Sequence, residues 1–378
     1  MERKNKLKNR EMLSYEDEPI EKYGREEYVQ IPAAVKIKTA VIILITAAVA
    51  VLGYGLWRYI SPDNLSGSLS SANVKGDGFP VKITGKSVNN SDIAIINNNF
   101  AYISDTQFQV INASGGIVVD KRIKYSSPSM VSGGNYCLIY DTEGTGYQIE
   151  TTTETVFEGN AEDTIYSAEI IADGSYAILS KKDGYTSKLT VYDNNHQKKY
   201  AYSFSECYAV SISLSEDASK AVVCGLDAMK GGIISRVYVL DFTEEEPAAK
   251  IDFTEITTYK VRFLKNGNIA LVGDNSSMII TNDYQNKYEF TYNGYNLINS
   301  VINEEGMVLA LSPFRDGKSC EIWNISQNGS VNTIKTGIDI TAMDTYKENV
   351  AILGNNQISL FNTVQEKLIK VYDVGIDV

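Results

Sequence analysis

From Phe79 to the C-terminus, short apolar runs alternate with turns rich in glycine, asparagine and aspartate. The runs are four to seven residues long and rich in Val, Ile, Tyr and Phe, which favour β-strands. No stretch of ten or more residues in this part repeats its apolar positions with the period of a helix. The pattern predicts an all-β structure for residues 79–378.

Two sequence features recur through this part of the chain. The first is a polar turn before a nearly continuous apolar strand, as in "ADGSYAILS", "KNGNIALVG" and "EEGMVLALS". The second is a strand that closes on Asn, Asp or Thr before another polar turn, as in "LTVYD" and "MIITN". The closing residues are Asn112, Thr151, Asp193, Asp241, Asn282, Asn324 and Asn362. Successive closing residues lie 38 to 48 residues apart, and the widest interval holds the insertion Gly225–Ile234.

A period near 40 residues with four strands in each unit is typical of β-propeller blades. Seven closing residues divide residues 79–378 into units of about 43 residues. Six blades would need about 50 residues each and eight about 38, and neither agrees with seven closing residues. The sequence therefore predicts an all-β, seven-bladed β-propeller.

Blade packing explains the strand types and predicts the turns. The middle strands lie between two neighbouring blades, so they need continuous apolar runs such as "YAIL". The turn before them needs a residue that tolerates positive φ, which Gly174 and Gly267 supply. The pairs Asp217-Ala218 and Lys347-Glu348 have no glycine, so these turns are expected to be of another type.

Ring closure is expected to involve both ends of the propeller sequence. "FPVKITG" (Phe79–Gly85) and "KLIKVYDVGIDV" (Lys367–Val378) both resemble outer strands of the last blade. A blade shared between them would lock the ring and leave no long exposed sheet edge. We therefore expect a shared last blade.

An uncharged apolar stretch precedes the propeller. As a helix, Thr39–Trp57 would be about 28 Å long, close to the ~30 Å hydrocarbon core of a bilayer. Nine Lys or Arg residues precede it, whereas Arg58 and Lys75 alone follow closely. The positive-inside rule then places the N-terminus in the cytoplasm and the C-terminal domain outside the plasma membrane. A cleaved signal peptide is the alternative, with the small-residue site Ala48–Ala50 in the middle of the run.

This stretch divides the chain into four parts. Residues 1–36 form a charged cytoplasmic tail with few bulky apolar residues, which is not expected to fold alone. Residues 37–60 form the transmembrane helix. Residues 61–78 are rich in Ser, Gly, Asn and Asp, as flexible linkers are. Residues 79–378 form the seven-bladed ectodomain.

Composition narrows the classes of partner and cofactor. Residues 59–378 carry a net charge of −14, which repels phosphate backbones and argues against nucleic acid as a partner. No P-loop, GxSxG, HExxH or EF-hand pattern occurs, so neither a cofactor nor a metal is expected. The only histidine, His196, lies in a polar turn without a catalytic partner and is expected to be exposed. The four cysteines have strand-like neighbours and no CxxC pair, which favours buried free thiols, with one disulfide as the alternative.

The layout of tail, membrane helix, Ser/Gly linker and propeller resembles an uncharacterised bacterial family known mainly from Gram-positive anaerobes. The matching features are the anchor, the segment "GFPVKI" and repeats such as "SAEIIADGSYAILSKKDGYTSKLTVYD". The blades are similar to WD40 and quinoprotein-like units in outline, although the Gly-His and Trp-Asp dipeptides are missing. The resemblance implies a membrane-anchored propeller and carries over no catalytic residue.

A tyrosine recurs where one predicted blade leads into the next. These candidate binding residues are Tyr125, Tyr166, Tyr208, Tyr259 and Tyr295. On one rim of the channel they would form an aromatic mouth suited to stacking on a sugar or holding a peptide. The alternative is that each tyrosine only seals the seam between two blades.

The sequence favours a binding or scaffolding ectodomain for an unknown protein or a cell-wall glycan, and it indicates no catalytic residue. The alternative is a hydrolase or lyase that acts on surface polysaccharide. Such an enzyme would need two loop carboxylates about 5–10 Å apart. The candidates for that pair are Asp141, Glu143, Asp183 and Asp227. A sensor that signals through the helix is a third hypothesis, but the tail carries no recognisable signalling domain.

Overall fold

The computed structural model describes residues 74–79, 81–83, 85, 88, 92–229, 231–315, 317 and 319–373. The expected tail, the expected transmembrane helix and residues 61–73 of the linker lie outside the described residues. Within the described part of the chain, no helix is long and apolar enough to cross a membrane.

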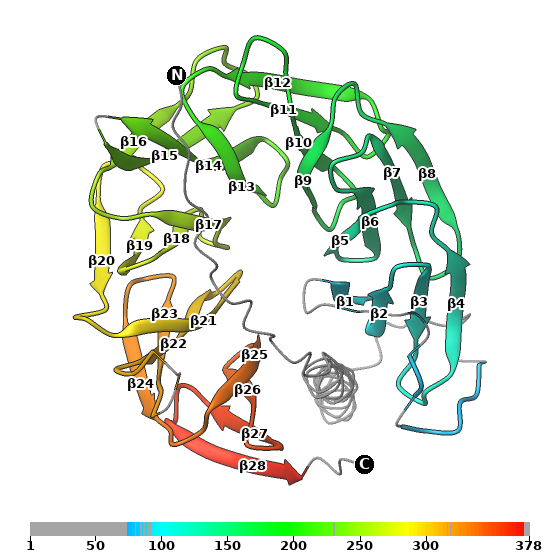
Figure 1. Ribbon diagram of the computed structural model, residues 1–378, viewed down its shortest axis with the longest axis vertical. Helices are drawn as coiled ribbons and strands as arrows, with labels where there is room; N and C mark the ends of the chain where they lie inside the picture. Colours follow the sequence, from blue (N-terminus) through cyan, green and yellow to red (C-terminus); the bar gives the residue numbers. More distant parts are fainter. Residues whose placement is uncertain are drawn as a thin grey trace, which may run out of the picture.

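Seven four-stranded antiparallel sheets surround a common centre (Figure 1). Each sheet is one blade, and its four strands follow one another along the chain. Blades 1 to 3 comprise β1 Ile93–Ile96, β2 Asn99–Ile103, β3 Gln107–Ile111, β4 Ile117–Arg122; β5 Pro128–Gly133, β6 Tyr136–Asp141, β7 Gly146–Glu150, β8 Thr155–Asn160; β9 Ile165–Ile170, β10 Tyr176–Ser180, β11 Ser187–Tyr192 and β12 Lys198–Phe204. Blades 4 and 5 comprise β13 Tyr208–Leu214, β14 Lys220–Met229, β15 Gly232–Asp241, β16 Ala249–Phe253; β17 Thr258–Phe263, β18 Ile269–Gly273, β19 Ser276–Ile280 and β20 Lys287–Thr291. Blades 6 and 7 comprise β21 Asn296–Asn303, β22 Gly306–Ser312, β23 Glu321–Ser326, β24 Val331–Lys335; β25 Ile340–Tyr346, β26 Asn349–Gly354, β27 Gln357–Asn362 and β28 Lys367–Asp373. The prediction of an all-β, seven-bladed propeller is confirmed.

Burial follows the position of a strand within its blade. Every residue of β10, β18 and β22 is buried, as expected for second strands covered on both faces. The outermost strands β20 and β28 are mostly exposed. The continuous apolar runs of the sequence therefore mark the second strands.

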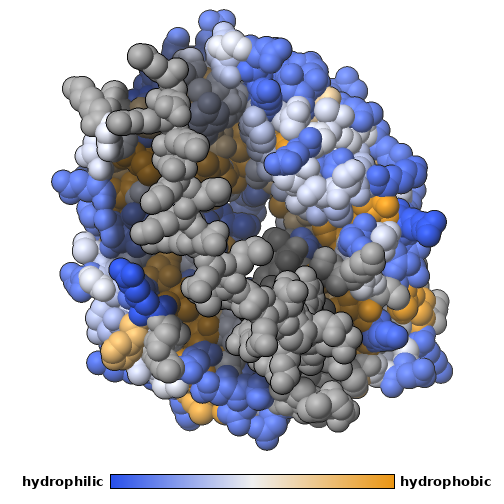
Figure 2. All heavy atoms as spheres, viewed as in Figure 1, coloured by the Kyte–Doolittle hydropathy of each residue, from blue (hydrophilic) through white to orange (hydrophobic). Residues whose placement is uncertain are grey.

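Neighbouring blades share apolar clusters that fill six of the seams between them. Between blades 3 and 4, for example, Leu179 and Leu189 pack with Val223 and Leu240. Figure 2 shows apolar residues between the blades and hydrophilic residues around the outer rim. Full burial of one such side chain stabilises the fold by about 1.5–3 kcal/mol, so the seams hold the ring together.

The seam between blade 7 and blade 1 is built differently, and the predicted shared blade is wrong. Among the described residues, β28 pairs with β27 alone, and β1–β4 complete blade 1 without a C-terminal strand. Phe79, Val81 and Ile83 instead pack against blade 1 beside Phe100 and Tyr102. The alternation in "FPVKITG" requires one buried face, and the face of blade 1 supplies it without a strand partner.

Hydrogen bonds fasten the chain before this segment to blade 1. The Gly78 N–H donates to the Ser114 carbonyl at 3.0 Å, in the β3–β4 turn. In the same turn, the Asn112 side-chain amide donates to the Val74 carbonyl at 2.7 Å. The described residues between 74 and 83 therefore form a strap across blade 1.

The turns between first and second strands have the predicted positive φ at glycine and also at two residues that carry a Cβ. Gly174 has φ +89° and Gly267 has φ +83°, as predicted. Ala218 has φ +52° and Lys347 has φ +50°, so their turns also use the left-handed region. As expected, the two turns are of other types, since the Ser215–Lys220 backbone hydrogen bond encloses four residues and the Tyr346–Asn349 pair two, whereas the turns at Gly174 and Gly267 enclose three. Hydrogen bonds hold a residue with a Cβ in the left-handed region despite a cost of about 1–2 kcal/mol.

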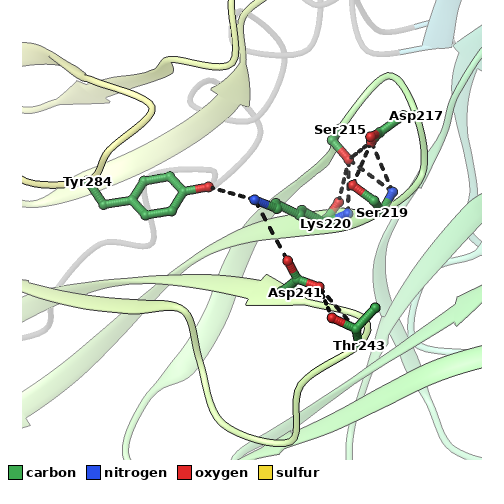
Figure 3. Close-up of polar contacts among 7 residues, drawn as sticks. All are labelled: Ser215, Asp217, Ser219, Lys220, Asp241, Thr243 and Tyr284. Carbon is green, nitrogen blue, oxygen red and sulfur yellow. Dashed lines mark hydrogen bonds and ion pairs between the residues drawn. The ribbon is translucent and has the colours of Figure 1, made fainter.

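Side chains around Ala218 supply those hydrogen bonds (Figure 3). The Ser215 hydroxyl oxygen accepts from the backbone N–H of Ser219 at 3.2 Å and of Lys220 at 2.9 Å. The Asp217 carboxylate accepts from the Ser215 hydroxyl at 2.7 Å and from the Ser219 N–H at 3.1 Å. These contacts replace the conformational freedom that Gly174 and Gly267 supply in blades 3 and 5.

The closing residues recur because they cap the turn between the third and fourth strands. Asp241 accepts from the Thr243 N–H at 3.1 Å, Asp193 from the Gln197 N–H at 2.8 Å and Asn362 from the Gln365 N–H at 2.7 Å. In Figure 3, Asp241 also faces the Lys220 ammonium, at 3.7 Å, and the ammonium lies 3.5 Å from the Tyr284 hydroxyl of blade 5. A capped turn thus also fastens one blade to the next.

The cysteines are free and buried, which confirms the favoured reading over a disulfide. Burial raises the pKa of Cys137 and Cys224 to about 12 and that of Cys207 to about 11. These thiols remain protonated at neutral pH, as expected for core residues.

His196 is not the exposed residue that the sequence suggested. Its ring stacks on Phe157 of blade 2, with ring centres 4.3 Å apart, beside the stacked pair Tyr176 and Tyr192. Its Nδ1 atom is buried without a hydrogen-bond partner. Burial lowers the pKa of His196, and the nearby Asp193 acts in the opposite direction.

We expect His196 to titrate below the ordinary imidazole pKa of about 6.5. Because the folded pKa is depressed, the unfolded chain takes up this proton first, so the contribution of His196 to stability is lost as pH falls below about 6.5. An NMR titration tests this directly, since the chain has one histidine. A pKa at or above 6.5 would show that the ring is hydrated instead of stacked in the seam.

Candidate functional site

One rim of the ring collects the starts of the innermost strands. These strands, β1, β5, β9, β13, β17, β21 and β25, face the centre in Figure 1. From β5 onwards, each begins after a connection from the outermost strand of the preceding blade, so these six strands begin on the same rim. Tyr166, Tyr208 and Tyr259 lie at the beginnings of β9, β13 and β17. Tyr125 and Tyr295 lie in the connections before β5 and β21.

The five predicted tyrosines divide into two groups. Tyr166, Tyr208 and Tyr259 are exposed by 37%, 64% and 38% on three consecutive blades. Tyr125 and Tyr295 are half-buried and pack into the clusters between blades 1 and 2 and between blades 5 and 6. The seam alternative therefore describes two of the five, and three remain candidates for the rim.

β-bulges define which rim positions are equivalent. In blades 3 to 7 one residue of the innermost strand is skipped in the pairing with the second strand. The skipped residues are Tyr166, Val210, Tyr259, Ile298 and Thr341, which we call the bulge ring. Tyr208 precedes the bulge of its strand by two residues, so it is a neighbour of the ring instead of a member.

The bulge turns these side chains out of the regular alternation. Tyr166, Val210 and Tyr259 are exposed by 37–40%, Thr341 is exposed and Ile298 is half-buried. Bulges re-aim side chains and are frequent beside functional sites. Blades 3, 4, 5 and 7 therefore present one aromatic, apolar or small polar side chain each at the mouth of the ring, whereas Ile298 of blade 6 packs into the cluster between blades 6 and 7.

The sequence reasoning missed Val210, Ile298 and Thr341, although the sequence carries a signal for them. In a regular strand, core positions recur every second residue. Around the bulge they are separated by three, as with Ile165 and Ala168 or Ala209 and Ile212. This break in alternation recurs in five repeats and marks the skipped residue.

Side chains just after the bulges connect neighbouring innermost strands, whose inner edges pair with no strand of the described part of the chain. The Ser211 hydroxyl accepts from the Val261 N–H and the Ser213 hydroxyl from the Phe263 N–H, each at 3.2 Å. The Lys260 ammonium donates to the Ser300 carbonyl at 2.9 Å and to its hydroxyl at 3.1 Å. These bonds fix the spacing of blades 4, 5 and 6 behind the bulge ring, and burial lowers the pKa of Lys260.

An ion network lies on the same rim of blade 4. Arg236 is buried, and its guanidinium lies 2.8 Å from Glu206, 2.9 Å from Asp252 and 3.4 Å from Asp227. Lys250 also contacts Glu206 and, with Arg236 and Tyr238, holds the pKa of that carboxyl low. The connection that carries Glu206 leads directly into Tyr208, so the network anchors the start of β13.

Residues 79–372 match the sequence model of DUF5711, a family of unknown function. The chain belongs to this family. A search of curated proteins finds no match to the DUF5711 chain.

Among solved structures, the DUF5711 domain is similar to the β-propeller domain of Myceliophteria thermophila Cps50 (Swd1). The two share 12% identity at a TM-score of 0.51, over 73% of this chain and 96% of that one. BamB from Moraxella catarrhalis shares 11% identity at a TM-score of 0.49, over 76% of this chain and 89% of that one. The first likeness supports the propeller fold and, at such low identity, nothing further.

The carboxylates considered for catalysis in this DUF5711 domain have structural roles in two cases. Asp141 accepts the Ser127 N–H at 2.8 Å, and Asp227 belongs to the ion network of Arg236. The insertion that carries Asp227 is an extension of the β14–β15 hairpin, paired as far as Met229 and Gly232. No contact between described residues joins Glu143 or Asp183 to a second candidate carboxylate.

Proposed function

We propose that this protein is a membrane-anchored binding module whose propeller holds a protein or glycan partner at the outer surface of the cell. The observation that carries the proposal is the bulge ring with its neighbour Tyr208. Rings and apolar groups exposed from a rigid scaffold offer contact area at low entropic cost.

The location is part of the proposal and rests on the sequence. Thr39–Trp57 would span the bilayer with the N-terminus in the cytoplasm, and residues 61–78 would lift the propeller from the headgroups. The net charge of −14 over residues 59–378 favours a neutral or basic partner surface over an acidic one.

The partner can be identified by placing a photo-cross-linking amino acid at position 166 of the protein in the cell. After irradiation, mass spectrometry identifies the molecule that is cross-linked. The same residue at position 288 is the control, because Tyr288 is 47% exposed but lies on the outermost strand β20. We expect a partner that cross-links from position 166 and not from position 288. Equal labelling from both positions would contradict a specific mouth.

The double variant Tyr166→Ala/Tyr259→Ala is then expected to bind that partner at least about tenfold more weakly. Its melting temperature should change by less than about 2 °C, because both side chains are more than a third exposed and contribute little to the core. Calorimetry and thermal melting measure the two effects. Tyr288→Ala is the matched control and should change neither the affinity for the partner nor the melting temperature. Unfolding of the double variant, or unchanged affinity, would support a seam role instead.

A further inference from the structure

The strap across blade 1 runs from one rim of the propeller to the other. We call the rim that carries the bulge ring the mouth rim and the opposite one the far rim. Because β4 leads into β5 at the mouth rim, the β3–β4 turn at the other end of β4 lies on the far rim. By the same alternation, the β2–β3 turn lies on the mouth rim. These two turns of blade 1 mark where the strap begins and ends.

The strap begins on the far rim, in close contact with the β3–β4 turn. The Gly76 N–H donates to the Ser114 hydroxyl at 3.2 Å. A Cβ on Gly76 would lie 2.2 Å from the Gly116 nitrogen, and a Cβ on Gly116 would lie 2.8 Å from the Val74 carbonyl oxygen. Glycine on both sides therefore lets the two backbones touch where the chain enters the propeller.

The strap leads from there to the mouth rim. Phe79, Val81 and Ile83 pack along the face of blade 1. Gly85 follows at the β2–β3 turn, where a Cβ on it would lie 2.3 Å from the Ser104 hydroxyl oxygen. The chain thus enters at the far rim, crosses the height of blade 1 and begins β1 at the mouth rim.

This point of entry limits how an anchored propeller can be oriented on a membrane. Residues 61–73 would join the expected membrane helix to Val74, and these thirteen flexible residues reach about 20 Å on average. The rims lie at least about 20 Å apart, because innermost strands such as β13 and β25 have seven residues. With the mouth towards the bilayer, the linker would need its whole average reach to arrive at the far rim. The mouth would then lie against the headgroups, with no room for a macromolecular partner.

The charge of the far rim does not reverse this conclusion. Its turns carry exposed carboxylates, such as Glu244, Glu245 and Glu246 between β15 and β16 and Glu304 and Glu305 between β21 and β22. They repel an anionic lipid surface, but salt screens this repulsion beyond a Debye length of about 8 Å. A linker that reaches about 20 Å lets the far rim face the bilayer from outside that distance.

The apolar groups of the mouth rim offer an alternative, in which the mouth itself rests on lipid. Tyr208, Ile233 and Phe314 are exposed by 64%, 53% and 55% and lie at the start of β13, in the β14–β15 hairpin and in the β22–β23 loop. Exposed aromatic and aliphatic side chains also occur on surfaces that bind the membrane interface. The entry of the chain at the far rim favours a partner beyond the membrane over a lipid surface.

We propose that the far rim faces the membrane and that the mouth is presented outwards, to a partner that lies farther from the bilayer than the propeller itself. This inference rests on the proposed function, because it takes the membrane anchor from it. It adds the side from which the partner must approach, and it excludes the lipid surface as the ligand of the bulge ring.

Energy transfer from a single labelled cysteine to acceptor-labelled lipid tests this orientation, with the full chain in nanodiscs of phosphatidylcholine and phosphatidylglycerol. The native thiols are buried, so an introduced cysteine takes the label. Asp183→Cys labels the mouth rim and Asn195→Cys the far rim, in the exposed turns before and after β11. We expect the label at position 195 to lie nearer the acceptors by more than about 10 Å, half of the distance between the rims.

A second pair, Asn275→Cys on the mouth rim and Gln285→Cys on the far rim, lies on either side of β19 and controls for a tilted ring. Equal distances from the two rims in both pairs overturn the inference. A shorter distance from the mouth rim in both pairs also overturns it and indicates lipid as the ligand of the mouth, while the anchor of the proposed function stands. A chain that does not insert into the nanodisc overturns the anchor as well.

Discussion

Arg236→Met is expected to destabilise the propeller by about 3 kcal/mol. The guanidinium is buried and faces three carboxylates, those of Glu206, Asp227 and Asp252. Removing it leaves Asp227 and Asp252 without an ion-pair partner among the described residues and Glu206 with Lys250 alone. The loss falls at the lower end of the range for broken buried pairs because the carboxylates are partly hydrated, with side-chain exposures of 25–48%.

Chemical denaturation followed by circular dichroism measures this loss. Lys250→Met is the matched control, because Lys250 contacts the same Glu206 from an exposed position and should cost less than about 1 kcal/mol. Arg236→Lys should fall between the two, since it keeps the charge but loses the planar fork that contacts several carboxylates. Equal costs for Arg236→Met and Lys250→Met would contradict the role of the buried guanidinium.

The deficit of Arg236→Met should also depend on pH. In the native protein the pKa of Glu206 is lowered, first by its contact with Lys250 and further by Arg236. A carboxyl whose folded pKa is depressed contributes stability above its unfolded pKa of about 4.3, and this is lost as pH falls through the folded pKa. Native protein and variant should therefore converge as pH falls through the depressed pKa of Glu206.

The blade count could be predicted because each repeat carries local features that packing makes necessary. A closing residue such as Asp193 caps its turn through a hydrogen bond to a residue four positions later, which does not depend on the rest of the blade. A second strand such as β10 must be apolar at every position because both faces are covered. Both features depend only on one blade and its neighbours, so they can be recognised in the sequence of a single repeat.

Features that depend on distant segments could not be predicted in the same way. "FPVKITG" alternates like an outer strand, but the sequence does not say whether its apolar side meets a strand partner or only a sheet face. The positive φ of Ala218 was not predicted, because Ser215 and Asp217 supply bonds that substitute for glycine. The sequence analysis singled out Tyr166 and Tyr259 because a tyrosine recurs between blades. Val210 is not a tyrosine, so only the break in the alternation of core positions could have identified it.

Gly133→Ala tests how rigidly one blade lies against the next. Gly133 ends β5, and a Cβ there would lie 2.3 Å from the Ile170 carbonyl oxygen and 2.7 Å from the Ile171 backbone of blade 3. Both obstacles are backbone atoms, so no side chain can rotate away. Ordinary contact would require blades 2 and 3 to separate by about 1 Å, which opens the cluster around Leu138 and Ile178.

We expect this variant to lose about 3 kcal/mol of stability, the upper end for overpacking, because the strain acts on a whole seam. Gly337→Ala is the matched control. A Cβ there meets nothing within 4 Å, so the change should be neutral or stabilise by up to about 1 kcal/mol through the unfolded chain. Thermal and urea unfolding compare the two variants. If Gly133→Ala costs no more than Gly337→Ala, neighbouring blades can shift freely, and the bulge ring cannot then be a preorganised surface.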